Sequence, residues 1–136
     1  MLERTLAIIK PEAVAQGDSG LIIFSIEKNK FKILGLKKVH LTQEDAQKFY
    51  AVHKDKPFYG ELVQGMIKGP VIVMALEKED AIRGWRELMG ATNPSQASLG
   101  TLRRMFGASI GDNATHGSDA PETAQQELGF FFKDLK

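Results

Sequence analysis

The sequence has 136 residues, of which 43% are hydrophobic and 26% are charged, and its formal net charge is +1. These proportions are typical of a folded globular protein and exclude a disordered chain, and the length predicts one domain over residues 1–136. The near-zero net charge gives no support to bulk nucleic-acid binding, and no apolar run approaches the roughly 20 residues that span a bilayer.

Two further features concern the cellular compartment. No cysteine is present, which excludes disulfides, thiolate chemistry and cysteine-based zinc sites. Residues 1–4 do not form a basic region followed by an apolar segment, so no secretory signal peptide is predicted. We therefore expect a cytoplasmic protein.

The first part of the chain alternates between predicted strands and helices. Residues 5–9 form a short apolar run that ends at Lys10-Pro11, which is typical of a buried strand leading into a turn. Residues 19–28 follow as a helix with isoleucines on one side. Residues 31–41 alternate loosely enough to predict a second strand.

A helical hairpin is predicted next. Thr42 and Asp45 have the spacing of a capping box, and the apolar positions behind them fall on one helical face as far as His53. Pro57 opens a second helix, and the short polar segment 54–56 joins the two.

The second half of the chain begins with a continuous apolar run over residues 71–76, which predicts a central strand. The remaining predicted elements are an amphipathic helix over 79–89, a loop over 91–100, a short helix through Leu102 and Met105, a short strand or loop over 113–118, and a last helix from near Asp119. Asp119 and Glu122 have the spacing of an N-cap and its N3 partner.

This order of elements predicts the fold class. Strands and helices alternate, with a helical hairpin between the second and third strands. The pattern is typical of an α+β sandwich, in which helices cover a sheet, built around a split βαβ unit.

One of the three histidines has unusual surroundings. Two of them end a predicted strand and a predicted helix, and we interpret both as ordinary surface or half-buried residues. His116 is followed by Gly117, which allows close backbone approach, and Asn113 and Ser118 offer neutral hydrogen bonds nearby. These surroundings leave His116 open between a functional and a structural role.

The last helix supplies a partner for His116. At 100° per residue, Glu127 falls on the same stripe as Ala124 and Leu128, and a buried carboxylate is costly unless it is paired. A histidine nucleophile needs one unprotonated nitrogen and a hydrogen bond at the other to hold the ring. Ser118 and Glu127 are suited to that task. The alternative is that Glu127 caps or bridges structurally.

Phosphoryl transfer also requires cations aimed at phosphate oxygens. Lys10 follows a buried strand, Arg86 borders an apolar helical stripe and Arg103 follows the long loop. Each alone is typical of a solvated surface charge, and the three become informative only together with His116. No P-loop is present, because the spaced glycines at 60 and 65 are followed by Met-Ile instead of Lys-Ser/Thr.

Four motifs connect these residues to a known family. They are Thr-Leu-Ala-Ile-Ile-Lys-Pro at 5–11, Thr-Asn-Pro at 92–94, Gly-Thr-Leu-Arg at 100–103 and Asn-x-x-His-Gly-Ser-Asp at 113–119. With them the chain resembles nucleoside diphosphate kinases over essentially its whole length. The resemblance implies a ferredoxin-like sandwich with a four-stranded antiparallel sheet.

The resemblance also implies an activity. The γ-phosphate of a nucleoside triphosphate would pass to a nucleoside diphosphate by a ping-pong mechanism, through His116 phosphorylated on Nδ1. Because every base has a π-face that can stack on an aromatic ring, we predict broad tolerance of base and sugar. Mg²⁺ would be held mainly by the nucleotide phosphates, with no direct protein ligand predicted.

Individual roles and partners follow from motif position. A homo-oligomer is implied, a tetramer or hexamer with a dimer left open, and neither a membrane nor a specific nucleic acid is expected as a partner. The implied site residues are Glu127 and Ser118 to position His116, Tyr50 beside that ring, Lys10 and Asn113 at the ribose, Arg86, Thr92 and Arg103 at the phosphates, and Phe58, Leu62 and Ile110 around the base.

Two positions depart from the family pattern. Thr115 stands where aliphatic residues are more usual, and Leu99 stands where some relatives have proline. A second class of function also stays open, since ferredoxin-like sheets serve as RNA-binding or ligand-sensing modules without catalysis. An RNA-binding sheet would display aromatic residues on its strands, and residues 6–9, 33–39 and 71–76 of the predicted strands contain none.

Overall fold

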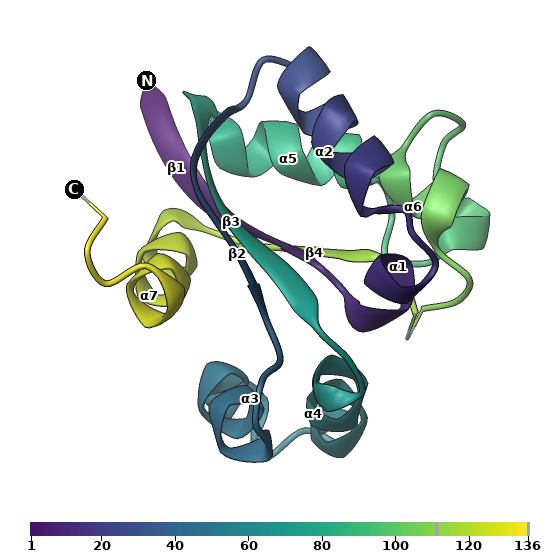
Figure 1. The fold of residues 1–136 in the computed structure, drawn as a ribbon, viewed down its shortest axis with the longest axis vertical. Helices are drawn as coiled ribbons and strands as arrows, with labels where there is room; N and C mark the ends of the chain where they lie inside the picture. Colours follow the sequence, from purple (N-terminus) through teal and green to yellow (C-terminus); the bar gives the residue numbers. More distant parts are fainter. Residues whose placement is uncertain (111, 136) are drawn as a thin grey trace.

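The computed structural model describes residues 1–110 and 112–135. Its centre is an antiparallel sheet with the strand order β2-β3-β1-β4 (Figure 1). The strands are β1 (Leu2–Ile9), β2 (Lys32–Val39), β3 (Val71–Glu79) and β4 (Thr115–Gly117). This arrangement confirms the predicted ferredoxin-like α+β sandwich.

Alternation along the central strands divides the core into two layers. In β1, Ala7 and Ile9 face one apolar cluster, and Leu6 and Ile8 face the other. All four are fully buried, as expected for a strand covered on both faces. The continuous apolar run at the start of the sequence therefore reflects burial on both sides of the sheet.

Helices cover the two faces (Figure 1). One face carries α2 and α5 with α1 and α6 at one end, and the other carries the α3–α4 hairpin and α7. Their bounds are α1 Pro11–Ala15, α2 Ser19–Lys28, α3 Gln43–Phe49, α4 Tyr59–Ile67, α5 Ala81–Met89, α6 Leu102–Phe106 and α7 Pro121–Phe131, with short 3-10 turns at η1 Ala51–His53 and η2 Pro94–Gln96.

Most predicted elements are present, with shifted ends. The capping box of Thr42 and Asp45 is confirmed, because the Thr42 hydroxyl accepts from the Asp45 N–H at 3.1 Å. Strand β1 begins at Leu2, and β3 continues to Glu79, because these residues pair with each other across the sheet. The predicted turn after Lys10 instead continues into helix α1, with proline in its first turn.

Three helix boundaries in the middle of the chain were predicted too early or too late. The helix expected to run as far as His53 ends at Phe49, and the 3-10 turn η1 follows it. Helix α4 begins at Tyr59 rather than at Pro57. Helix α5 begins at Ala81, where the Glu3 carboxylate accepts the N–H of Ile82 at 2.8 Å. A partner from another strand thus sets where α5 begins.

The last helix begins near Asp119 as predicted, but the predicted N-cap was wrong. Ala120 occupies the N-cap of α7, and the side chain of Asp119 makes no cap. The Asp119 carboxylate instead accepts from Arg86 of α5 at 2.6 Å, since the chain leaves β4 beside that guanidinium. The predicted stripe of α7 is confirmed, because Ala124 and Leu128 are buried. None of the helices formed by residues 1–110 and 112–135 combines the length and apolar character needed to cross a membrane.

Candidate active site

Strand β4 presents His116 at the edge of the sheet. His116 pairs with Ile8 of β1, and the side chain is about 20% exposed. The rings of Phe49 and Tyr50, at the end of α3, meet the imidazole edge-on with centroids 5.5 and 6.4 Å away. Burial raises the pKa of the Tyr50 hydroxyl. Tyr50 is therefore neutral and lies beside His116, at the position implied for it.

The carboxylate of Glu127 joins His116 and Ser118. Nε2 of His116 lies 3.3 Å from Oε1 of Glu127, and the Ser118 hydroxyl donates to the same oxygen at 2.7 Å. The Ser118 oxygen in turn accepts the Leu6 N–H at 3.3 Å, which anchors it to β1. With Nε2 directed at a carboxylate, Nδ1 is the nitrogen available for chemistry.

A cationic cleft lies beside β4. Its volume is about 450 Å³. Three predicted phosphate ligands, Arg86, Thr92 and Arg103, contribute to its wall, whereas His116 itself is not part of the lining. The other lining residues are Ile82, Arg83, Glu87, Gly90, Ala91 and Asp119.

Arg103 connects this cleft to β4, the histidine strand that carries His116. Its guanidinium donates to the carbonyl of Gly90 at 3.1 Å and to that of Thr115 at 3.0 Å. Burial, and then the charge of Arg86, lower the pKa of Arg103 to about 10. No partner for the buried Nε is found among the residues that the structure describes. A guanidinium has five N–H donors and these two bonds use one on each terminal nitrogen, so Arg103 keeps donor capacity for an anion.

Lys10 and Asn113 form a second polar group next to the cleft. The ammonium of Lys10 donates to the Asn113 side-chain oxygen at 2.7 Å, and the Asn113 amide donates to the Thr92 carbonyl at 3.1 Å. Burial lowers the pKa of Lys10 from its ordinary value to about 8. Residues from the end of β1, the long loop and the start of β4 are thus held together.

Comparison with known proteins identifies the family. The family model described as nucleoside diphosphate kinase matches residues 3–136. The chain belongs to the nucleoside diphosphate kinase family. Curated relatives of that name include those of Geotalea uraniireducens, 53% identical, and Desulfotalea psychrophila, 55% identical, in both cases over 99% of this chain and 98% of the relative.

Solved structures of nucleoside diphosphate kinases agree with this fold. The Aquifex aeolicus enzyme superposes with a TM-score of 0.97 at 43% identity, covering 99% of this chain and 98% of that one. The enzyme of Halobacterium salinarum, solved in complex with CDP, gives 0.93 at 39% identity, covering 98% and 90%. This chain is accordingly a phosphotransferase that acts on nucleoside di- and triphosphates.

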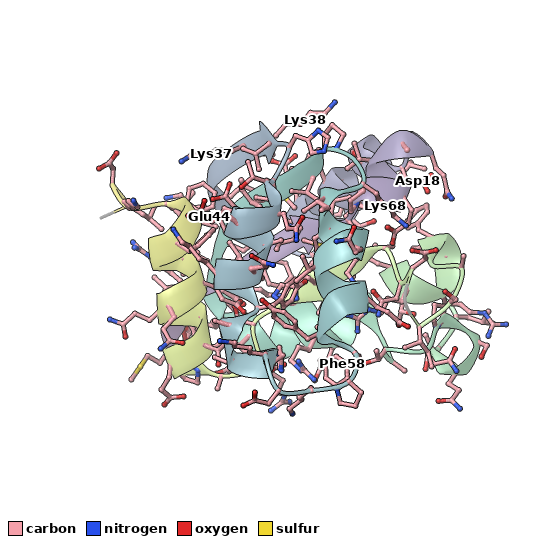
Figure 2. All side chains as sticks on the ribbon, turned by 90° about the horizontal axis from the view of Figure 1, so that it is seen from below. Asp18, Lys37, Lys38, Glu44, Phe58 and Lys68 are labelled. Carbon is pink, nitrogen blue, oxygen red and sulfur yellow. The ribbon has the colours of Figure 1, made fainter. Side chains whose placement is uncertain are left out.

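The predicted base-binding residues of this nucleoside diphosphate kinase lie apart from the cleft. Phe58, Leu62 and Ile110 are absent from its lining. Phe58 lies just before α4 (Figure 2) and is 44% exposed. Its ring centroid is 5.8 Å from that of His53. Ile110 is 60% exposed on the loop before β4. The phosphate and ribose residues are connected through the hydrogen bonds of Asn113, whereas none of the three predicted base-binding residues lines the cleft.

Sequence reasoning missed two residues that hold the histidine strand of this nucleoside diphosphate kinase. The buried indole of Trp85 donates to the His116 carbonyl at 3.1 Å, and Gly117 packs against the same ring. Glu12 accepts the N–H of Ala114 at 3.2 Å. A buried indole N–H requires a partner, so Trp85 carried a usable signal. Nothing in the sequence pointed to Glu12.

The two departures from the family pattern differ in burial. Thr115 is fully buried, and its hydroxyl has no hydrogen-bond partner among the described residues. This unpaired hydroxyl destabilises the core beside β4. Leu99 is 84% exposed on the loop before α6.

The side chains of the cleft suit phosphate oxygens. Among the described residues, no group of three His, Asp or Glu side chains could hold an ion. The wall has three arginines and two carboxylates: Glu87 is paired with Arg83 and Asp119 with Arg86, which leaves a net positive charge at Arg103. The residues present fit polyphosphate oxygens, which can themselves bind a divalent cation.

Proposed function

We propose that His116 carries the phosphoryl group between two nucleotides by a ping-pong mechanism. The observation that supports this most directly is the shared oxygen of Glu127, which engages Nε2 of His116 and the Ser118 hydroxyl at once. This contact orients the ring and places the proton on Nε2. Nδ1 keeps its lone pair for attack.

The first half-reaction forms one bond and breaks one. The Nδ1 lone pair bonds to the γ-phosphorus of a nucleoside triphosphate, and the bond from that phosphorus to the β-phosphate oxygen breaks. The oxygen leaves with its electron pair as part of the nucleoside diphosphate. In the second half, a β-phosphate oxygen of another diphosphate attacks the phosphorus, and Nδ1 recovers its lone pair. Glu127 stabilises the positive charge that develops on the imidazole.

The phosphates would be held in the cationic cleft. Arg86, fixed by Asp119, and Arg103, fixed by two backbone carbonyls, present guanidinium groups from two different helices. Preorganised donors of this kind supply most of the catalysis in phosphoryl transfer. Thr92 adds a neutral contact. We assign Mg²⁺ to the nucleotide phosphates, and it would offset their negative charge.

The ribose and base would extend away from the phosphates. We assign Lys10 and Asn113 to the ribose hydroxyls, because their side chains already contact each other at 2.7 Å beside Thr92. We assign stacking on the base to the exposed ring of Phe58, and further apolar contacts with the base to Leu62 and Ile110. Contact through a π-face supports broad base and sugar tolerance. Since the cell's nucleotide pool supplies these substrates, we also propose a cytoplasmic location.

A second copy of the chain is the proposed partner protein. Strand β2 forms one edge of the sheet, and Leu36 on it is 46% exposed. Leu36 pairs with Met74, whose side chain belongs to the core under α2, so it lies on the face that α2 covers. Leu21 and Phe24 of α2 are each 58% exposed. These three apolar side chains and the open strand edge suit a self-complementary interface.

The non-catalytic alternative loses support from the fold. An RNA-binding sheet needs one open face with aromatic residues. Here buried apolar clusters under helices occupy both faces of the central strands. No observation favours a sensing module over the enzyme.

Labelling tests the mechanism. The protein is incubated with γ-labelled ATP and Mg²⁺, and we expect an acid-labile, base-stable phosphoenzyme that a nucleoside diphosphate discharges. His116→Ala should not be labelled. His40→Ala is the matched control, because His40 bonds the carbonyl of Ile67 away from the cleft. Label that persists in His116→Ala would disprove the proposed intermediate.

A further inference from the structure

A tight turn immediately precedes the histidine strand. The Thr115 N–H donates to the Asn113 carbonyl at 2.9 Å, which closes a three-residue turn around Ala114. Ala114 is fully buried, and its φ is +72°. A non-glycine residue adopts this left-handed region only against steric opposition from its Cβ. The turn is therefore strained, and its surroundings must hold it in place.

The turn separates two groups assigned to the site. Asn113, on one side, contacts Lys10 and Thr92. His116 lies two residues beyond Ala114. If the backbone at Ala114 relaxed to a negative φ, the directions of both side chains would change relative to each other and to the cleft.

Both backbone polar groups of Ala114 are held by the segment after β1. The Lys10 N–H donates to the Ala114 carbonyl at 2.8 Å. The Ala114 N–H donates to the Glu12 carboxylate at 3.2 Å. The first contact is backbone to backbone, so any residue at position 10 other than proline provides it. The second depends on a side chain, and it joins residues 102 positions apart.

Glu12 is suited to a fixed orientation. It lies in the first turn of α1, and its side chain is 13% exposed. Its second oxygen is 3.9 Å from the ammonium of Lys68, which bonds Asp112 at 2.9 Å. Lys68 follows α4 at the opposite end from Phe58 (Figure 2). The carboxylate thus has one short contact, to the strained turn, and one longer contact to a partly exposed cation.

We propose that Glu12 is a positioning residue for the phosphoryl transfer: its carboxylate holds Ala114 in the left-handed turn that aims Asn113 and His116. This inference rests on the proposed function of His116 and adds a residue that contacts neither nucleotide nor imidazole. Because misplacement of a reacting group by about 1 Å can cost up to a hundredfold in rate, loss of the contact should impair the chemical step.

Four variants test the role by single-turnover phosphorylation of His116 at saturating ATP. Glu12→Ala removes the acceptor and should slow labelling by about tenfold to a hundredfold. Glu12→Gln keeps an acceptor oxygen and should stay within about threefold of the parent. Lys68→Met removes the neighbouring cation and should also stay within about threefold, because the turn keeps its acceptor.

The fourth variant separates positioning from stabilisation. Glycine at position 114 adopts a left-handed φ without steric opposition. Glu12→Ala combined with Ala114→Gly should therefore recover at least about fivefold of the rate lost in Glu12→Ala alone. A carboxylate that only stabilised the fold through Lys68 would give additive losses and no recovery. Thermal unfolding of each variant provides the comparison for stability.

Amide exchange at Ala114 tests the contact without catalysis. Protection of this N–H should fall in Glu12→Ala and persist in Glu12→Gln. If the parent protein is labelled but the rate of Glu12→Ala stays within about twofold of the parent rate, the positioning role is overturned and the proposed function is not. The same conclusion follows if Ala114→Gly restores none of the rate lost in Glu12→Ala. A loss in Glu12→Gln as large as in Glu12→Ala would overturn it in favour of a charge effect. An unlabelled parent would overturn the proposed function and the kinetic role with it.

Discussion

Thr115 carries a hydroxyl group that is completely buried next to His116. Among the described residues its oxygen finds no hydrogen-bond partner, whereas its carbonyl accepts from Arg103. A buried polar atom without a partner costs about 1 to 3 kcal/mol. An aliphatic residue at this position would avoid that cost.

Replacing this hydroxyl should stabilise the protein. We expect Thr115→Val to raise the free energy of unfolding by about 1 kcal/mol, because valine has the same shape without the polar atom. Thr115→Ser, which keeps the hydroxyl and removes the methyl group, should lower it. Urea denaturation measures both. A destabilised Thr115→Val would mean that the hydroxyl has a partner in solution.

Lys10 makes nucleotide binding depend on pH. Its pKa is lowered by burial to about 8, so the unliganded protein loses the ammonium charge as the pH rises through that value. We expect nucleotide affinity to fall above about pH 8, measured by titration calorimetry, because a neutral amine binds polyphosphate and ribose oxygens less strongly. In Lys10→Arg this fall in nucleotide affinity above about pH 8 should be absent, since arginine stays charged.

The same residue affects stability in the opposite direction. Folding disfavours the charged form of Lys10, so the unfolded chain binds more protons between pH 8 and 10.5. The contribution of Lys10 to the free energy of unfolding should therefore rise across this window. Lys10→Met should lack that rise, and an unchanged slope in the variant would contradict the assignment.

At the scale of elements, β4 and α5 depend on close contact at Gly117. A Cβ added there would lie 2.4 Å from Cδ1 and 2.6 Å from Nε1 of Trp85, so either β4 or α5 must move. The same indole donates to the His116 carbonyl. The strand that presents the proposed nucleophile is therefore placed by a helix.

Gly117→Ala should separate these two elements. We expect about 1 to 3 kcal/mol of destabilisation from overpacking, together with slower labelling of His116. Gly129→Ala is the matched control, because a Cβ in that position of α7 meets nothing within 4 Å. It should be neutral or stabilising by up to about 1 kcal/mol, since alanine favours helix. Equal loss in both variants would contradict the packing argument.

The α3–α4 hairpin carries the proposed base contact. Loss of a stacked aromatic ring costs about 1 to 3 kcal/mol per base, and we expect Phe58→Ala to weaken ADP and CDP binding by similar amounts within that range. Val52→Ala is the control, as Val52 is 77% exposed in the neighbouring turn. Loss of affinity for only one base would contradict the predicted base tolerance.

At the scale of the whole molecule, the two apolar clusters share the central strands. Neighbouring residues of β1 alternate between the clusters, so neither cluster can form without the strand that serves the other. We propose on this ground that residues 1–136 fold as one domain. Assembly adds a second level, because the edge formed by β2 and α2 leaves apolar side chains exposed.

Charges on that edge should weaken assembly. We expect Leu21→Glu with Phe24→Glu to reduce the mass measured by analytical ultracentrifugation, because two carboxylates would be desolvated in the interface. Lys30→Glu, at an exposed position just after the same helix, provides a control with the same change in charge. An unchanged mass in the first variant would place the interface elsewhere or exclude it.

Local pattern was sufficient for much of the fold. The apolar runs of β1 and β3, the capping box at Thr42 and the buried stripe of α7 each depend on neighbours close in sequence, and each was predicted. Helix α1 was missed, since its five residues carry too little periodicity. Asp119 was misassigned because a carboxylate before a helix fits a cap equally well until Arg86 is known to lie beside it.

The sequence by itself predicted the fold class and the contact between His116 and Glu127, because helical phase and motif spacing are local properties. Only the tertiary structure decided which other partners those groups meet. The contacts of Glu12 with Ala114 and of Trp85 with His116 join residues 102 and 31 positions apart. Such contacts depend on how the strands and helices are stacked, and no local pattern encodes that geometry.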